Sequence, residues 1–137
     1  MGTQLLIMGT AGVSIFVTDK DQLDPKGRIT VRTNPGFGNW QNYIMTNTGA
    51  YAFRWFRDAL GSFEVATSKL MGGDPYDIIT QTASHSCPGA NGVTALTCIQ
   101  GSHTRVKNEK ARGGFFGISL GTTKADLCRS NSGRHLL

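Results

Sequence analysis

The sequence predicts a mixed α/β or α+β fold, with antiparallel strands first and mixed helices and strands after them. Up to residue 46, β-branched and aromatic residues come in short runs separated by turns that contain glycine or proline. This pattern is typical of short antiparallel strands. From residue 52 onward, apolar residues recur at helical spacing, and short apolar runs follow. Strands followed by mixed elements place the chain in these two classes.

The strands expected in the first part are residues 4–18 in two halves, 28–32 and 40–45. The two halves, LLIM and VSIFVT, are joined through the small residues Gly9-Thr10-Ala11-Gly12. Asp24-Pro25-Lys26-Gly27 has the composition of a turn, because proline presets one φ angle and glycine accepts a positive one. Asn34-Pro35-Gly36 is expected to end the strand before it. Consecutive strands joined by tight turns predict an antiparallel meander.

Three helices are expected after the strands. Apolar residues between Ala52 and Leu60 follow helical spacing, and Gly61 is expected to end that helix. Asp74-Pro75 begins a second helix, which is expected to run to about Ser86. Thr123 and Asp126 resemble a capping box, with aspartate in place of glutamate, and predict a last helix.

Two further strands are expected between these last helices. Residues 88–92 turn the chain, and 93–99 form a short apolar run. A glycine-rich, basic connection leads to residues 115–120, which are apolar enough for a buried strand.

Charge and cysteine content limit the possible functions. The net charge of +5 lies in the last third, where seven Lys/Arg face two acidic residues, whereas the first 101 residues hold seven of each. That basic third suits a phosphate-rich ligand or an acidic partner, but it lacks the interleaved aromatic residues of a nucleic-acid groove. The three cysteines, Cys87, Cys98 and Cys128, form no C-x-x-C pair, so we expect buried, reduced thiols and no metal site. No apolar run approaches membrane-spanning length, and a cytoplasmic location is expected.

Four segments resemble the FGGY family of carbohydrate kinases, in the order and at the approximate spacing of that family. Residues 111–129 resemble its A-R-G-x-F-F-G-L-(S/T)-L core with the helix that follows, and 88–93 resemble its P-G-A-N-G-L turn. Residues 51–61 resemble its L-R-W-(L/F)-R-D-x-L-G helix, and 8–13 its G-T-S-G-V loop. Together they cover most of residues 4–129.

The resemblance implies a fold and an activity. FGGY kinases have two actin-like, ribonuclease H-like domains that close on a cleft and transfer a phosphoryl group from ATP, with Mg²⁺, to a sugar hydroxyl. Residues 1–129 are interpreted as the first half of the C-terminal domain of a xylulokinase-like member. Residues 130–137 are expected to be an irregular tail from a frameshift or truncation, because the family's A-x-x-E-G pattern gives way to a polar run there.

The resemblance also implies the residues that bind the cofactor: Gly9, Thr10, Ala11, Gly12, Gly49, Ala50 and Arg54. The first four match the family's second phosphate loop, where small residues let N–H groups approach phosphate oxygens. The alternative for this segment is a simple hairpin turn. Gly49 and Ala50 match small residues at the start of a helix whose N-terminus lies beside the nucleotide phosphates. Arg54 matches a nucleotide-facing position or, alternatively, lies on a solvated helix face.

No catalytic residue is assigned. The family's general base is an aspartate in a G-x-G-D-x-x-x-G segment, which is expected about two dozen residues ahead of Gly9 and so before Met1. The N-terminal domain and the G-G-G-x-x-S adenosine loop are also expected to be missing, so we expect no catalysis by this chain alone. Residues 101–113 depart from the family, because they lack its G-E-R-T-P core and both of its prolines.

Three alternatives remain open at this stage. The chain could derive from the autoinducer-2 kinase branch, whose R-W-F-R-D helix and altered basic loop also fit. It could be a non-catalytic module that binds a nucleotide or an acidic partner. It could also fold poorly and self-associate through exposed strand edges, since a sheet cut at its middle leaves strands unpaired.

Overall fold

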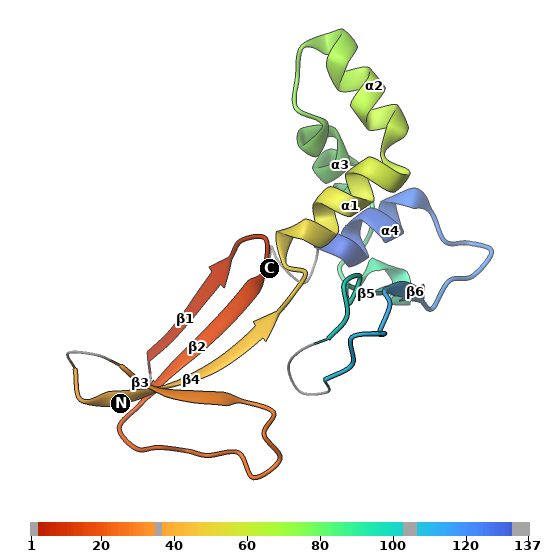
Figure 1. Cartoon of the computed structure of the whole chain (residues 1–137). Coiled ribbons are helices and arrows are strands. Elements are labelled where there is room, and N and C mark those ends of the chain that lie inside the picture. The colour runs from red at the N-terminus through yellow and green to blue at the C-terminus, as the bar shows by residue number, and fades with distance from the viewer. Residues whose placement is uncertain (1–2, 35–36, 103–106, 133–137) are drawn as a thin grey trace. The chain divides into compact units, whose positions relative to one another are not determined.

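The computed structural model describes residues 3–34, 37–102 and 107–132 (Figure 1). The chain forms two compact units. The first unit comprises Met1–Ala50 and Cys98–Arg112, and the second comprises Tyr51–Thr97 and Gly113–Leu137. Antiparallel strands come first and mixed helices and strands follow, so the predicted fold class is confirmed.

The first unit is built on a four-stranded antiparallel sheet of β1 (Thr3–Met8), β2 (Gly12–Thr18), β3 (Thr30–Asn34) and β4 (Asn39–Thr46). The spatial order is β1-β2-β4-β3, so the predicted meander is wrong: β4 lies between β2 and β3. All seven residues of β2 pair with β4, from Gly12↔Thr46 to Thr18↔Trp40. The shorter and more polar β3 pairs through five residues with the other edge of β4.

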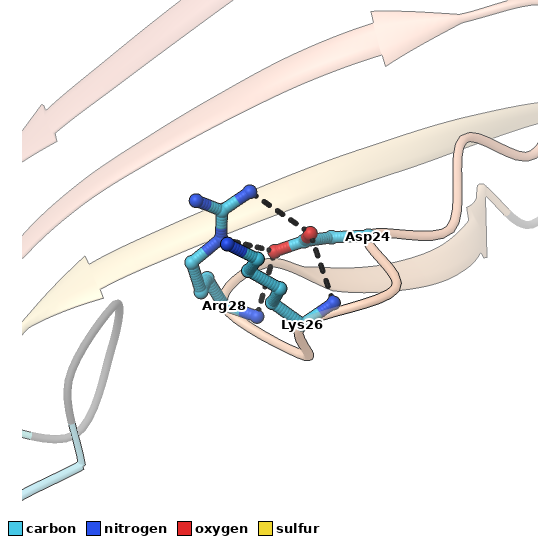
Figure 2. A network of polar contacts seen from close by, with 3 residues as sticks. All are labelled: Asp24, Lys26 and Arg28. Carbon is cyan, nitrogen blue, oxygen red and sulfur yellow. Dashed lines mark hydrogen bonds and ion pairs between the residues drawn. The ribbon is translucent and has the colours of Figure 1, made fainter.

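Asp24 organises the long connection between β2 and β3, drawn in orange in Figure 1. Its carboxylate accepts hydrogen bonds from the backbone N–H groups of Lys26 and Arg28 and from the Arg28 guanidinium (Figure 2). The side-chain bond from Arg28 holds the pKa of Asp24 well below its ordinary value. The predicted turn is confirmed, because the Gly27 N–H donates to the Asp24 carbonyl at 2.8 Å and Gly27 has a positive φ. Since Arg28 is held in this loop, β3 begins at Thr30 and not at residue 28.

The second unit packs helices around a small core. Its elements are α1 (Ala50–Leu60, whose first residue belongs to the first unit), α2 (Ser62–Met71), α3 (Pro75–Ser84), the 3-10 turn η1 (Ala90–Gly92), β5 (Thr94–Leu96), β6 (Gly114–Phe116) and α4 (Lys124–Ser132). The buried cluster consists of Phe56, Ile79, Ala83 and Cys128. Burial raises the pKa of the Cys128 thiol to about 11. None of the three cysteines forms a disulfide, but Cys87 is exposed, so the expectation of a buried thiol is wrong there.

Helix α2 was not predicted from the sequence. Gly61 ends α1 as expected, but a new helix begins at the next residue. A Cβ on Gly61 would lie 2.6 Å from the carbonyl oxygen of Arg57, so the junction requires glycine. The buried side chains of α2 are the polar Glu64 and Ser68, while Phe63, Leu70 and Met71 are exposed, so its buried face is not the apolar face by which a helix is usually detected in a sequence.

The predicted helix starts are confirmed. The Asp74 side chain accepts from the Tyr76 N–H at 2.9 Å, and α3 then runs to Ser84, two residues short of the expected end. The Thr123 N–H donates to Asp126 Oδ2 at 2.8 Å, as in a capping box. Helix α4 continues three residues past Arg129, into the expected tail; residues 133–137 of that tail lie outside the described residues.

The two predicted C-terminal strands are shorter than expected. Strands β5 and β6 have three residues each and pair antiparallel with one another. The prediction of a buried strand over 115–120 is wrong, because Ile118 and Leu120 are exposed. Gly117 has a φ of 79°, and a Cβ there would lie 2.4 Å from the Gly92 carbonyl oxygen, so the chain leaves the strand at this glycine.

Two further findings concern the described residues. Ser102 and Asn108 form an isolated antiparallel bridge, with backbone hydrogen bonds of 2.9 and 2.8 Å. Residues 103–106 of that segment and Pro35-Gly36 lie outside the description. Within the described part, no helix has the length and apolarity to cross a membrane.

Candidate functional site

The loop formed by residues 9–12 joins β1 to β2 in the first unit. Met8 pairs with Gly12 as the last pair of the β1–β2 ladder, and the Gly9 N–H donates to the Ala11 carbonyl at 3.0 Å. The loop is therefore a tight hairpin connection, and the hairpin-turn reading of its local conformation is correct. A hairpin turn can also bind a ligand, so the conformation of the 9–12 loop does not by itself settle its role. The contacts around the loop must be considered as well.

Two hydrogen bonds attach this loop to the segment that starts α1. The Gly49 N–H donates to the Thr10 carbonyl at 2.8 Å, and the Ala50 N–H donates to the Gly9 carbonyl at 2.9 Å. All four residues lie in the first unit. Residues 39 and 41 positions apart are thus joined backbone to backbone, and six of the seven predicted site residues lie in this cluster.

Gly49 is the most tightly constrained glycine of the cluster. It is buried, and a Cβ there would lie 2.6 Å from Ala11 C, 2.6 Å from Gly12 N and 2.8 Å from Gly9 O. These are backbone atoms, so no side-chain rotation can relieve the clash. On Gly12 the nearest atom to an added Cβ is the Thr46 hydroxyl at 2.9 Å, and on Gly9 it is a carbonyl oxygen at 3.8 Å.

The loop presents hydrogen-bond donors that find no acceptor in the described part of the chain. Within the described residues, the N–H groups of Thr10 and Ala11 and the Thr10 hydroxyl donate to no protein acceptor. Thr10 is exposed and Ala11 is half-buried. Adjacent backbone N–H groups of this kind form a concave site for an anion. The N–H groups of Gly49 and Ala50, by contrast, are already bonded to the loop.

Arg54 lies in the second unit, on α1. Its side chain is 62% exposed, and its Nε lies 3.8 Å from the carboxylate of Asp58, one turn further along the helix. These contacts are those of a solvated helix face, which was one of the two interpretations of this residue.

The sequence did not reveal the distant partners of one buried carboxylate. Asp126, which was predicted only as a cap, also accepts hydrogen bonds from Ser86 at 2.6 Å and from Asn91 at 2.8 Å. The Ser86 and Thr123 bonds hold its pKa well below the ordinary value. Because all these donors belong to the protein, Asp126 is a structural hub and not a ligand site. The sequence signal for this cluster was Asn91. Asparagine tolerates a positive φ, and Asn91 adopts a φ of 50° in the turn from which it donates to Asp126.

A second buried carboxylate lies nearby in the same unit. Glu64 of α2 is buried and forms a 2.7 Å ion pair with Lys124 at the start of α4. Across the described residues, no three His, Cys, Asp or Glu side chains come together as candidate metal ligands.

Comparison with known sequences finds sugar kinases. A gluconokinase from Bacillus licheniformis is 33% identical over 129 residues, which make up 94% of this chain and 25% of that protein. A xylulose kinase from Staphylococcus xylosus is 26% identical over 129 residues, or 93% of this chain and 24% of that protein. No family model matches the chain. The chain thus spans about a quarter of the length of these relatives.

Solved structures agree in fold. A gluconate kinase from Lactobacillus acidophilus superposes with a TM-score of 0.78 at 20% identity, over 93% of this chain and 24% of that one. A xylulose kinase from Bifidobacterium adolescentis superposes with a TM-score of 0.76 at 25% identity, over 93% of this chain and 23% of that one.

Proposed function

Because the chain belongs to the FGGY carbohydrate kinases, as a segment of their actin-like C-terminal domain, we propose that its 9–12 loop binds the phosphates of ATP. One observation carries this proposal. The N–H groups of Thr10 and Ala11 are adjacent in the chain, belong to residues that are not buried, and have no protein acceptor among the described residues. A phosphate oxygen would complete the hydrogen bonding of both groups.

The activity proposed for the whole enzyme is transfer of the γ-phosphoryl group of ATP to a carbohydrate hydroxyl. The relatives above are named for gluconate and for xylulose. The sequence favours a pentulose such as xylulose, whereas the higher identity to a gluconokinase, 33% against 26%, favours gluconate. The proposed location of this activity is the cytoplasm.

This chain would hold the cofactor through its backbone. Mg²⁺ is usually bound through substrate phosphates, waters and one or two carboxylates. Mg²⁺ that accompanies ATP would be held chiefly by phosphate oxygens and waters. When bound, Mg²⁺ offsets charge on the phosphates. The task of this chain is to orient the phosphates with N–H groups and the Thr10 hydroxyl.

Calorimetric titration of the purified 137-residue chain tests this proposal. We expect binding of Mg·ATP in the micromolar to millimolar range, and Thr10→Val should weaken it about tenfold by removing one donor to a charged group. Thr33→Val, which changes an exposed threonine on β3, is the matched control and should bind as the wild type does. Absence of binding by a folded chain would overturn the proposal.

Inorganic triphosphate separates the kinase segment from a stand-alone nucleotide-binding module. Equal affinity for triphosphate and ATP would mean that only phosphates are bound, as expected of this loop. Clearly tighter binding of ATP would point to base and ribose contacts and favour the module. A coupled assay for ADP release with gluconate and with xylulose should detect no turnover by this chain, and turnover would contradict the expectation that it is inactive alone.

Strand β1 is the proposed site of self-association. Each of its six residues is exposed, it lies at an edge of the sheet, and the chain carries no charge before Asp19. Edge strands without charge or proline pair readily with other chains. Leu6→Lys should shift the chain toward monomer in sedimentation, whereas Leu70→Lys, at an exposed leucine of α2, should not. A wild-type monomer at high concentration would refute this idea.

A further inference from the structure

We infer that Gly49 and Ala50 position the phosphate loop without contacting phosphate. Their N–H groups hold the carbonyl groups of Gly9 and Thr10, and this turns the N–H groups of Thr10 and Ala11 outward as a pair. This inference rests on the proposed function of the loop and assigns separate tasks to the two segments. Residues 9–12 bind the phosphate, and residues 49–50 hold the loop in its conformation.

The argument begins with peptide geometry. The Gly9 carbonyl and the Thr10 N–H belong to one peptide group, and the Thr10 carbonyl and the Ala11 N–H belong to the next. In a trans peptide the C=O and N–H bonds point in opposite directions, and the described residues contain no cis peptide. Both carbonyls are held against the 49–50 segment, at 2.9 and 2.8 Å. Both N–H groups must therefore point away from that segment.

Two successive N–H groups on one side of a loop are the donor arrangement of an anion nest. In a free hairpin loop each peptide can rotate, and the two N–H groups need not agree in direction. Here each peptide is fixed by a separate hydrogen bond to a residue 39 or 41 positions away in the sequence. The donors are thus oriented before any ligand arrives, which lowers the cost of binding.

The absence of a side chain at residue 49 makes this arrangement possible. A Cβ there would meet backbone atoms of Gly9, Ala11 and Gly12 at 2.6 to 2.8 Å, well inside van der Waals contact. Alanine at this position would force the two segments apart and lengthen both hydrogen bonds. Ala50 is exposed, so its side chain is not constrained in this way and its contribution is the N–H group.

Amide NMR of the full 137-residue chain distinguishes the two tasks. On titration with inorganic triphosphate, the Thr10 and Ala11 amide signals should shift, while those of Gly49 and Ala50 should shift little and exchange slowly with solvent. Gly49→Ala should lower triphosphate affinity at least tenfold and abolish the Thr10 and Ala11 response, with the second unit still folded. Gly73→Ala is the matched control, because a Cβ at Gly73 would meet no atom within 4 Å.

Each outcome decides the question. If the Gly49 and Ala50 amides respond as strongly as those of Thr10 and Ala11, or if Gly49→Ala binds triphosphate as the wild type does, the positioning role is wrong and the proposed function stands. If the wild-type chain binds no triphosphate, both proposals fall. Should Gly49→Ala fail to fold, the amide pattern of the wild type alone decides between a binding and a positioning role.

Discussion

The sheet of the first unit and the helices of the second bury their apolar side chains to very different extents. Among the described residues, Ile15 is the only buried hydrophobic side chain of the first unit. Those of the second unit are Ala52, Phe56, Ile79, Ala83, Ala90, Val93, Ala95 and Cys128. The first unit is therefore held mainly by its strand ladder and its backbone contacts. The second is held mainly by side-chain packing. We therefore expect truncation of a buried side chain to destabilise the second unit more than the first.

The same contrast appears in the two carboxylates whose pKa is lowered. Asp24 orders a surface connection through the nearby guanidinium of Arg28, within five residues of sequence. Asp126 is buried and accepts from Ser86, Asn91 and Thr123, so it joins the end of α3, the η1 turn and the start of α4. A local carboxylate shapes one loop, whereas a buried one with distant partners supports a whole unit.

The largest expected effect is that of Phe56→Ala. Phe56 is fully buried, and its truncation should destabilise the second unit by about 3–5 kcal/mol. Ile15→Ala should cost about 2 kcal/mol, because its surroundings are already partly exposed. Trp40 in β4 and Trp55 in α1 report on the two units separately in urea titrations of single-tryptophan variants. If each substitution shifted the urea midpoints reported by Trp40 and Trp55 equally, the two units would unfold as one. The difference in stability between the sheet and the helices would then not exist.

A smaller effect is expected for Asp126→Asn, and its sign depends on pH. The pKa of Asp126 is lowered in the folded state, so its contribution to stability is complete above the unfolded pKa of about 3.9 and is lost as pH falls below it. At pH 7 the variant should be less stable, since an amide places a donor against the existing donors. Between pH 4 and pH 2 the stability of the variant should fall less steeply than that of the wild type. If the acid-unfolding curves of Asp126→Asn and the wild type were parallel, this prediction would be wrong. Asp21→Asn, which removes an exposed carboxylate, is the control for the change in charge.

The smallest effect is expected for Asp24→Asn. Arg28 is half exposed, and the bonds of Asp24 stay within one surface loop, so the urea midpoint of either tryptophan signal should not change measurably. Hydrogen exchange at the Lys26 and Arg28 amides should become faster, because both lose their carboxylate acceptor. A shift of the global midpoint as large as that of Asp126→Asn would show that the two carboxylates are equivalent.

The turns and helix starts that depend on neighbouring residues could be predicted from local patterns in the sequence. The hairpin over residues 4–18, the turn at Gly27 and the helix starts at Asp74 and Thr123 were all predicted correctly. Each depends on hydrogen bonds or φ preferences that span only a few residues. The four motifs also predicted the likeness to FGGY kinases that the comparisons found, and six of the predicted site residues lie together around the 9–12 loop.

Contacts between residues that are distant in the sequence could not be predicted from local patterns. The order of β3 and β4, the early end of β6 at Gly117 and the partners of Asp126 all depend on contacts across many residues. The same holds for Gly49, which the sequence presented as one small residue among several. Its role follows from three backbone atoms within 2.8 Å of a Cβ that it lacks. Such distances exist only once the sheet has brought the two segments together, and no local pattern encodes them.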